Sequence, residues 1–256
     1  MKTQRDRRIL GTTAVPNASA FTRLELTAVL VALAVLAALA LPVLANNRER
    51  SQRVVCVNNL RLAGQGLQEW ATEHGGQLQW RTSWTEGGTM VVSAPYPPWQ
   101  GLQNNVWFQW AWLSNDLRSP RILVCPSDTN KVQASDWTSY NPGGGFAHAN
   151  FRDKSVSYLI GLDVLQEHTD GLVAGDRNVI FNGSLTAGCS SGVTPARTIL
   201  PRSPNAGVGS GLHEGAGNFL FKDGRVEELS SQAFARKMAL LYGNSDNSSV
   251  HFQTPN

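Results

Sequence analysis

Residues 19–45 read SAFTRLELTAVLVALAVLAALALPVLA, and this stretch decides the fold at the N-terminal end of the chain. From Leu26 to Ala45 the only polar side chain is Thr27. Twenty helical residues at about 1.5 Å each span the roughly 30 Å hydrocarbon core of a bilayer. Alanine and leucine dominate the run, and both favour helix. We therefore expect a membrane-spanning helix over residues 21–45.

Three interpretations of this apolar run remain open. An ordinary signal peptide would be cut after Ala45, but the apolar core of such peptides is usually only about 7–15 residues long. An uncleaved signal anchor is the second interpretation. The third is a cleavable leader over residues 1–20, which carry four basic side chains and one acidic one, followed by a helix that is retained. The charges that flank the run favour only slightly a leader on the cytoplasmic side.

Glu25 distinguishes these interpretations. A carboxylate at the start of a membrane helix is costly unless it is paired. Neither a signal peptide nor a plain anchor has an evident use for it there. Its position predicts a specific partner for the carboxylate.

The junction around Glu25 resembles the type IV prepilin processing site, in which a small residue precedes Phe-Thr and a glutamate stands fifth in the mature chain. The resemblance implies leader cleavage between Ala20 and Phe21 by a prepilin peptidase, N-methylation of Phe21, and an assembly role for Glu25. In pilin-like filaments the corresponding glutamate is thought to meet the new N-terminal amine of a neighbouring subunit. Pro42 matches the helix-kinking proline that pilins carry. The site departs from the family at Ala20, where glycine is commonest, and at Arg23, where an apolar residue is usual.

Beyond the apolar run, residues 46–76 predict an amphipathic continuation of the same helix. Apolar or small residues recur there at spacings of three and four and form one stripe: Val57, Leu60, Gly64, Leu67 and Ala71. The glycine at position 75 suits the left-handed position that ends a helix. We expect one long helix from about Thr22 to His74.

Residues 77–256 predict a globular head of short strands and long irregular loops. Residues 121–125 look strand-like. Residues 218–227 predict a hairpin whose two-residue turn is Asp223-Gly224, with Phe221 opposite Val226. A helix capped by Ser230 or Ser231 should follow, and a polar tail should come after it. The expected class is α+β with the pilin plan, a long N-terminal helix packed on a small antiparallel sheet.

Several spaced motifs extend the resemblance over nearly the whole chain. His213 is followed after nine residues by Asp223-Gly224, and shorter matching stretches occupy residues 56–61, 125–128 and 174–178. This combination resembles a large group of bacterial proteins that join a prepilin leader to a head with a His-x9-Asp-Gly ending. That group is similar to the major pseudopilin of type II secretion. The resemblance implies an architecture and no biochemical activity.

The two matching stretches at residues 56–61 and 125–128 each begin with a cysteine. The resemblance leads us to expect a disulfide between Cys56 and Cys125, with a buried free thiol as the alternative for each. Disulfides are chemically permitted outside the cytoplasm. Cys189 would then be unpaired.

Polar residues of the motifs invite a catalytic or metal-binding interpretation, which we weigh against a structural one. His213 and Asp223 could serve in metal or acid–base chemistry, but the turn uses Asp223, and His213 is expected to pin its own loop by hydrogen bonds. Asp176 with Arg177 is expected to order a loop, and Asp128 to form a turn. Pseudopilin heads often bind calcium, yet no Asp-x-Asp-x-Asp set occurs here. We expect no cofactor, with calcium as the alternative, and no enzyme, since nucleophile-elbow, phosphate-loop and dinucleotide motifs are absent.

The charge balance and the tryptophan content bear on which binding partners are expected. The 236 residues after the leader carry 18 basic and 18 acidic side chains, the totals of 22 and 19 less the leader's four and one, so no nucleic-acid partner is expected. Most of the eight tryptophans are expected to pack in the core or between helix and head, with an exposed ligand platform as the alternative.

Together with the apolar run, the resemblance implies a structural subunit in the cytoplasmic membrane, single-pass, with its head on the periplasmic or extracellular side. Its expected partners are prepilin peptidase, other pilin-like subunits, the inner-membrane platform of a type II secretion or type IV pilus-like system, and lipid. The alternative is an anchored extracytoplasmic binding protein for polysaccharide or protein. A metal-dependent hydrolase is a third, more distant possibility.

Overall fold

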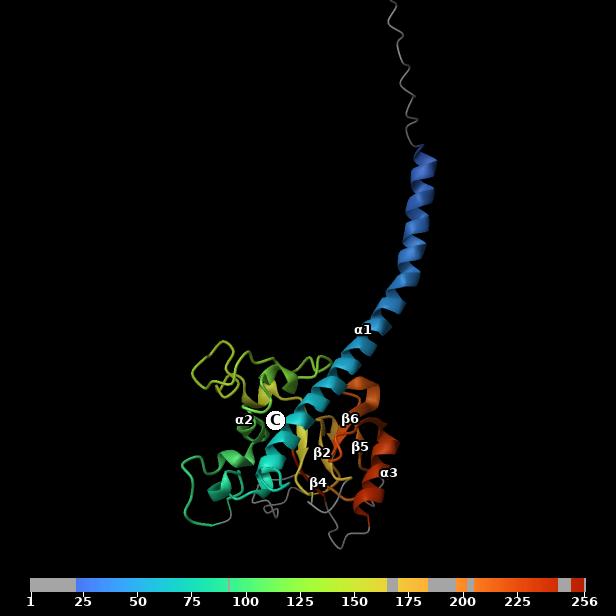
Figure 1. Cartoon of the computed structure of the whole chain (residues 1–256). Helices are drawn as coiled ribbons and strands as arrows, with labels where there is room; N and C mark the ends of the chain where they lie inside the picture. Colours follow the sequence, from blue (N-terminus) through green and yellow to red (C-terminus); the bar gives the residue numbers. More distant parts are fainter. Residues whose placement is uncertain are drawn as a thin grey trace, which may run out of the picture. The chain divides into compact units, whose positions relative to one another are not determined.

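A computed structural model describes residues 22–91, 93–164, 170–183, 197–201, 205–243 and 250–255, without the side chains of residues 42–48. Ala20, Phe21 and Cys189, and the side chain of Pro42, lie outside this description. The chain divides into two compact units, Met1–Asn47 and Arg48–Asn256. The second unit combines helices with an antiparallel sheet, which confirms the α+β class (Figure 1).

The helix α1, Arg23–Glu73, has the long span that the sequence predicts. In the first unit, its segment Arg23–Leu41 is long and apolar enough to cross a membrane, and none of it is buried. The helix ends where the glycines at 75 and 76 take positive φ angles of 66° and 81°. The amide of Gly76 donates to the carbonyl of Ala71 at 2.7 Å, which satisfies one of the last free carbonyls of the helix.

In the second unit, α1 presents a buried stripe to the head. Three of the five predicted stripe residues are buried, while Val57 and Gly64 are only half-buried. The stripe is therefore rotated slightly from the predicted one, and it follows spacings of four and three: Cys56, Leu60, Ala63, Leu67 and Trp70.

The main sheet has six antiparallel strands in the order β4-β8-β1-β2-β6-β7. Their bounds are β1 Tyr158–Gly161, β2 Leu172–Asp176, β4 Arg197–Ile199, β6 Ala216–Phe221, β7 Val226–Ser230 and β8 Val250–Gln253. A separate antiparallel pair consists of β3, Val179–Ile180, and β5, Gly207–Val208.

Helices flank these strands. The α-helices after α1 are α2, Val106–Trp112, and α3, Ser231–Tyr242. Short 3₁₀ helices are η1 Gln79–Arg81, η2 Trp84–Glu86, η3 Leu102–Asn104, η4 Pro120–Leu123, η5 Arg152–Ser155 and η6 His213–Gly215. The cap of α3 is Ser230, whose hydroxyl accepts the amide of Ala233.

The six-stranded sheet separates two hydrophobic cores. Side chains alternate between the faces of a strand, so Leu220 joins the core that contains the stripe of α1, whereas Phe219 and Phe221 join the core beneath α3. On the second face, Phe234 and Met238 of α3 are fully buried. Both faces of the sheet are therefore covered.

The hairpin is present, but its predicted register is wrong by one residue. Leu220 pairs with Val226, and Phe221 faces Arg225, so the connection has three residues, Lys222 to Gly224. Gly224 takes a φ of 82°, the left-handed conformation that closes a three-residue hairpin loop.

Two further predictions are wrong. Residues 121–125 contain no strand, because the 3₁₀ helix η4 begins at Pro120, and the hydroxyl of Ser119 caps it by accepting the amide of Arg121. The expected polar tail instead contains β8, which pairs with β1 and β4 in the sheet.

The tryptophans pack inside the head, as predicted. Trp70, Trp80, Trp107 and Trp110 are buried. The other four are half-buried: Trp84, Trp99, Trp112 and Trp137. None of the eight is fully exposed, and a ligand platform that uses the half-buried four stays an alternative.

Candidate functional site

The start of α1 holds Glu25 in a local hydrogen-bonded arrangement. Its Oε2 accepts the backbone amide of Thr22 at 2.9 Å and the hydroxyl of Thr22 at 3.0 Å. In return, the amide of Glu25 donates to that hydroxyl at 3.2 Å. This is a reciprocal capping box, signalled by the Thr-x-x-Glu spacing. Glu25 therefore has a local use, as a helix cap, that would also be available to a plain anchor.

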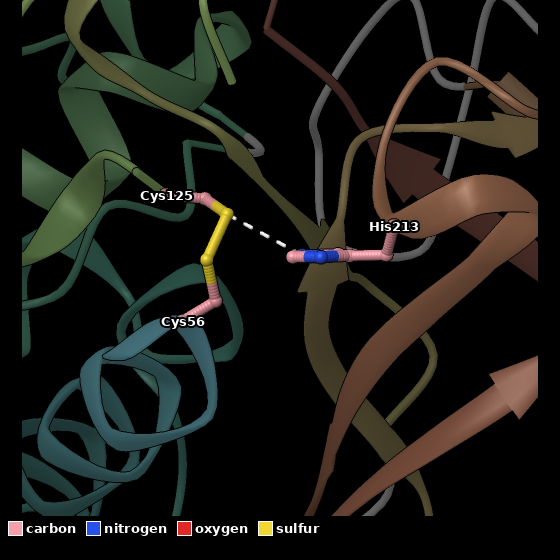
Figure 2. Close-up of side chains that lie close together, drawn as sticks. All are labelled: Cys56, Cys125 and His213. Atoms are coloured by element: carbon pink, nitrogen blue, oxygen red, sulfur yellow. Dashed lines mark hydrogen bonds between the residues drawn. A yellow bond between two sulfur atoms is a disulfide. The ribbon is translucent and has the colours of Figure 1, made fainter. Parts of the chain in front are cut away.

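Behind α1, three motif residues from distant parts of the sequence meet in the interior of the second unit (Figure 2). Cys56 of α1 is bonded to Cys125, which follows η4, in the disulfide that the resemblance implies. Nε2 of His213 lies 3.4 Å from the Cys125 sulfur. The disulfide and the imidazole are buried, and we call this group, with Asp176, the sulfur–histidine centre.

Asp176 lies at the end of β2 on the other side of the same imidazole nitrogen. Its Oδ2 is 3.4 Å from Nε2 of His213, and both side chains are fully buried. The same oxygen accepts the amide of Asn218 at 2.7 Å and its side-chain Nδ2 at 3.0 Å. His213 thus contacts the disulfide and a carboxylate, rather than pinning its own loop as predicted.

Burial sets the charge state of this pair. It raises the pKa of the Asp176 carboxyl to about 7, although the two hydrogen bonds from Asn218 lower it. Burial also lowers the pKa of His213, and the nearby positive charge of Arg53 adds to this effect. Near neutral pH the imidazole is therefore uncharged.

Asp128 and Arg177 form an ion pair that the sequence did not predict. The guanidinium of Arg177 donates to both carboxylate oxygens of Asp128, at 2.7 and 2.8 Å, and Asp128 is buried. The predicted pairing of Arg177 with Asp176 is therefore wrong, and Asp128 is more than a turn residue. By contrast, Asp223 serves its turn as predicted, because its Oδ1 accepts the amide of Arg225.

The turn that carries His213 has an unusual backbone. His213 and Glu214 both have positive φ angles, 48° and 55°, and the glycine at 215 follows with 86°. Residues other than glycine rarely adopt this region, at a cost of roughly 1–2 kcal/mol each. Surrounding contacts must hold the turn in place.

Two side chains supply those contacts. Nδ2 of Asn178 donates to the carbonyls of Gly209, Leu212 and Ala216, which flank the turn, at 2.8, 3.2 and 3.0 Å. Arg53 of α1 binds Glu214 at 3.0 Å. The same guanidinium also binds two further carboxylates, at 2.9 and 3.1 Å: Glu49 and Glu228. In the sequence, residues 174–178 stand out only as a matching stretch, which does not predict the hydrogen bonds of Asn178.

The sulfur–histidine centre is also where the described residues could hold a metal. Within that part of the chain, the group whose ligand atoms lie within 4.8 Å of one another is Cys56, Cys125 and His213. It offers sulfur and nitrogen, whereas calcium prefers oxygen. Calcium binding elsewhere stays a prediction.

Comparison with known proteins adds no family to these observations: no protein-family model, curated protein or solved structure matches the chain.

The raised pKa of Asp176 gives stability a pH dependence. The Asp176 carboxyl keeps its proton to higher pH in the folded protein than in the unfolded chain. Its contribution to the free energy of unfolding is therefore complete below pH 3.8 and is lost as pH rises through about 7. His213 acts in the opposite direction, because its lowered pKa makes stability rise with pH up to its ordinary value of 6.5. Between about pH 5 and pH 8, the Asp176 contribution lowers the free energy of unfolding with a slope that approaches about 1.4 kcal/mol per pH unit. We expect Asp176→Asn to remove this slope.

The measurement is urea unfolding of the full chain in mild detergent across this pH range. Asp136→Asn is the control, because hydrogen bonds with Thr138 and Asn141 lower the pKa of Asp136 to about 2, and its effect is confined to acid pH. An unchanged pH slope in Asp176→Asn would show that Asp176 is ionised at neutral pH.

Asn178→Asp should destabilise the His213 turn. The substitution keeps the shape of the side chain but replaces the donor shared by three carbonyls with a repelling carboxylate, at a cost of about 1–3 kcal/mol. Urea midpoints of the full chain measure the effect. Asn150→Asp is the matched control, since that amide donates to one carbonyl, that of Pro142, in an exposed loop. Equal losses in the two variants would contradict the special role of Asn178.

Proposed function

We propose that the protein is a pilin-like or pseudopilin-like structural subunit, anchored in the cytoplasmic membrane by the first part of α1. The observation that carries the proposal is the segment Arg23–Leu41, which is apolar and entirely unburied. Ten large apolar side chains between positions 24 and 41 are exposed to solvent. Each square ångström of apolar surface in water costs about 25 cal/mol, so this segment requires lipid or partner helices.

Glu25 gives the anchor its assembly character. The proposed pathway removes the leader at Ala20, methylates the new N-terminus at Phe21 and inserts the helix beside those of other subunits. The amine of one subunit then meets Glu25 of another, which offsets the cost of placing each charge near lipid. A prepilin peptidase and an inner-membrane assembly platform are the partners that this pathway requires.

Protein extracted from membranes should begin at N-methylated Phe21. Intact mass and N-terminal sequencing measure this directly. A chain that begins at Asn46 would indicate ordinary secretion, and one that begins at Met1 would indicate an unprocessed anchor; either result overturns the proposal.

Glu25→Leu should abolish assembly while leaving membrane insertion intact, because leucine suits lipid but cannot pair with an amine. The readout is the yield of chemically cross-linked multimers in native membranes, together with the amount of monomer in the membrane fraction. We expect a loss of at least about ten-fold, the effect of roughly 1.4 kcal/mol per contact.

Thr22→Val is the matched control for this experiment. It removes the hydroxyl that Glu25 contacts in the capping box but keeps the carboxylate. Assembly of Thr22→Val at the wild-type level would assign the effect of Glu25→Leu to pairing between subunits. Equal losses in both variants would show that Glu25 acts only as a helix cap.

A groove on the head favours a second candidate, an anchored binding protein. The groove has a volume of about 630 Å³ and lies between α1 and the β6–β7 hairpin. Arg61, Gln65 and Gln68 of α1 line one side, and Leu220 and Phe221 line the other. This candidate predicts that Glu25→Leu leaves the protein fully functional, which distinguishes it from the first.

A further inference from the structure

The sulfur–histidine centre has the composition of a thiolate metal site whose sulfurs are joined to each other. We infer that the reduced form of this protein binds one Zn²⁺ ion through the sulfurs of Cys56 and Cys125 and Nε2 of His213. These three ligand atoms come from α1, from the segment after η4 and from η6, and they lie within 4.8 Å of one another. The inference is independent of the proposed function.

The distances within the centre suit zinc. Zn–S bonds of about 2.3 Å and Zn–N bonds of about 2.0 Å place a sulfur and a nitrogen on a tetrahedral ion about 3.5 Å apart. Nε2 of His213 lies 3.4 Å from the sulfur of Cys125, and Figure 2 shows the ring edge turned toward that sulfur. The histidine is thus already placed as a ligand, and the cysteine side chains need only separate.

Asp176 lies beside the site but outside the group of three whose ligand atoms lie within 4.8 Å of one another. Its Oδ2 lies 3.4 Å from the same Nε2, and its Oδ1 is buried without a hydrogen-bond partner. A buried carboxylate oxygen with no partner is costly in a folded protein, and a cation bound nearby would offset part of that cost. The three ligands of the site, two thiolates and one imidazole, are established zinc ligands.

The oxidation state controls the site. In the disulfide form the sulfurs are bonded to each other, so zinc has no thiolates to bind. A phosphine reductant adds two electrons to the bond, takes up an oxygen atom from water to become a phosphine oxide, and leaves two thiols. Zinc then displaces both thiol protons. The same two segments of the head are therefore joined by a covalent bond when oxidised and by a metal ion when reduced.

The test uses the full chain in mild detergent, reduced anaerobically with a phosphine that is then removed. Zinc chloride is titrated against a chromophoric chelator, and X-ray absorption at the zinc edge counts the ligands. We expect one zinc per reduced chain, with two sulfur and two lighter ligands, and none in the oxidised chain. Zinc should also raise the melting temperature of the reduced chain alone.

Variants identify the ligands. His213→Gln should weaken zinc binding by about 100-fold or more. Removal of a residue that only hydrogen-bonds to a metal ligand already costs up to about 100-fold in affinity. His148→Gln is the matched control, because that imidazole lies in a surface loop and accepts the amide of Asn150. Equal zinc affinity of the oxidised and reduced chains would overturn the inference. The inference would also be overturned if the reduced chain bound no zinc. A wild-type X-ray absorption spectrum with fewer than two sulfur ligands would overturn it as well, and that measurement requires no variant.

Discussion

The head depends on one constraint: the second part of α1 must stay against a sheet whose strands come from much later in the chain. The Cys56–Cys125 bond closes a loop with a sequence separation of 69 residues. In the chain-entropy account, a cross-link over a loop of this length stabilises the folded state by about 4 kcal/mol. That bond joins α1 to the segment after η4, and packing of the α1 stripe holds the helix against the sheet. The disulfide and the buried stripe therefore hold the helix to two different parts of the head.

His213 reaches this disulfide only because its backbone is held in an unfavourable conformation. Two successive residues with positive φ would relax if the segment were free. Asn178 fixes the carbonyls on both sides of the turn, and Arg53 fixes Glu214. Arg53 belongs to α1, so the helix contributes twice to the sulfur–histidine centre, once through Cys56 and once through Arg53. Loss of either contact would weaken the placement of the ring.

The sequence predicts local features better than contacts between distant segments. The long helix follows from its apolar run and its terminal glycines, and the hairpin follows from the dipeptide Asp223-Gly224. The predicted hairpin register was wrong because Gly224 alone takes the left-handed conformation, which makes the loop longer than the predicted two-residue turn. The strand predicted at residues 121–125 is absent because capping by Ser119 favours a 3₁₀ helix over the strand propensity of the residues that follow. The contact between Asp176 and His213 had no sequence signal, since it exists only once β2 and η6 are brought together.

The local role of Glu25 is compatible with the intermolecular role that we propose for it. Both hydrogen bonds that the Glu25 carboxylate accepts in the capping box fall on Oε2, which leaves Oε1 for a partner. Removal of the leader at Ala20 would keep Thr22, and with it the cap, in the mature chain. The box also fixes the direction of the side chain, so less conformational entropy is lost when a neighbouring amine binds. In the proposed assembly, a glutamate that first caps its own helix would therefore be better prepared for pairing, and the Thr-x-x-Glu spacing would serve both purposes.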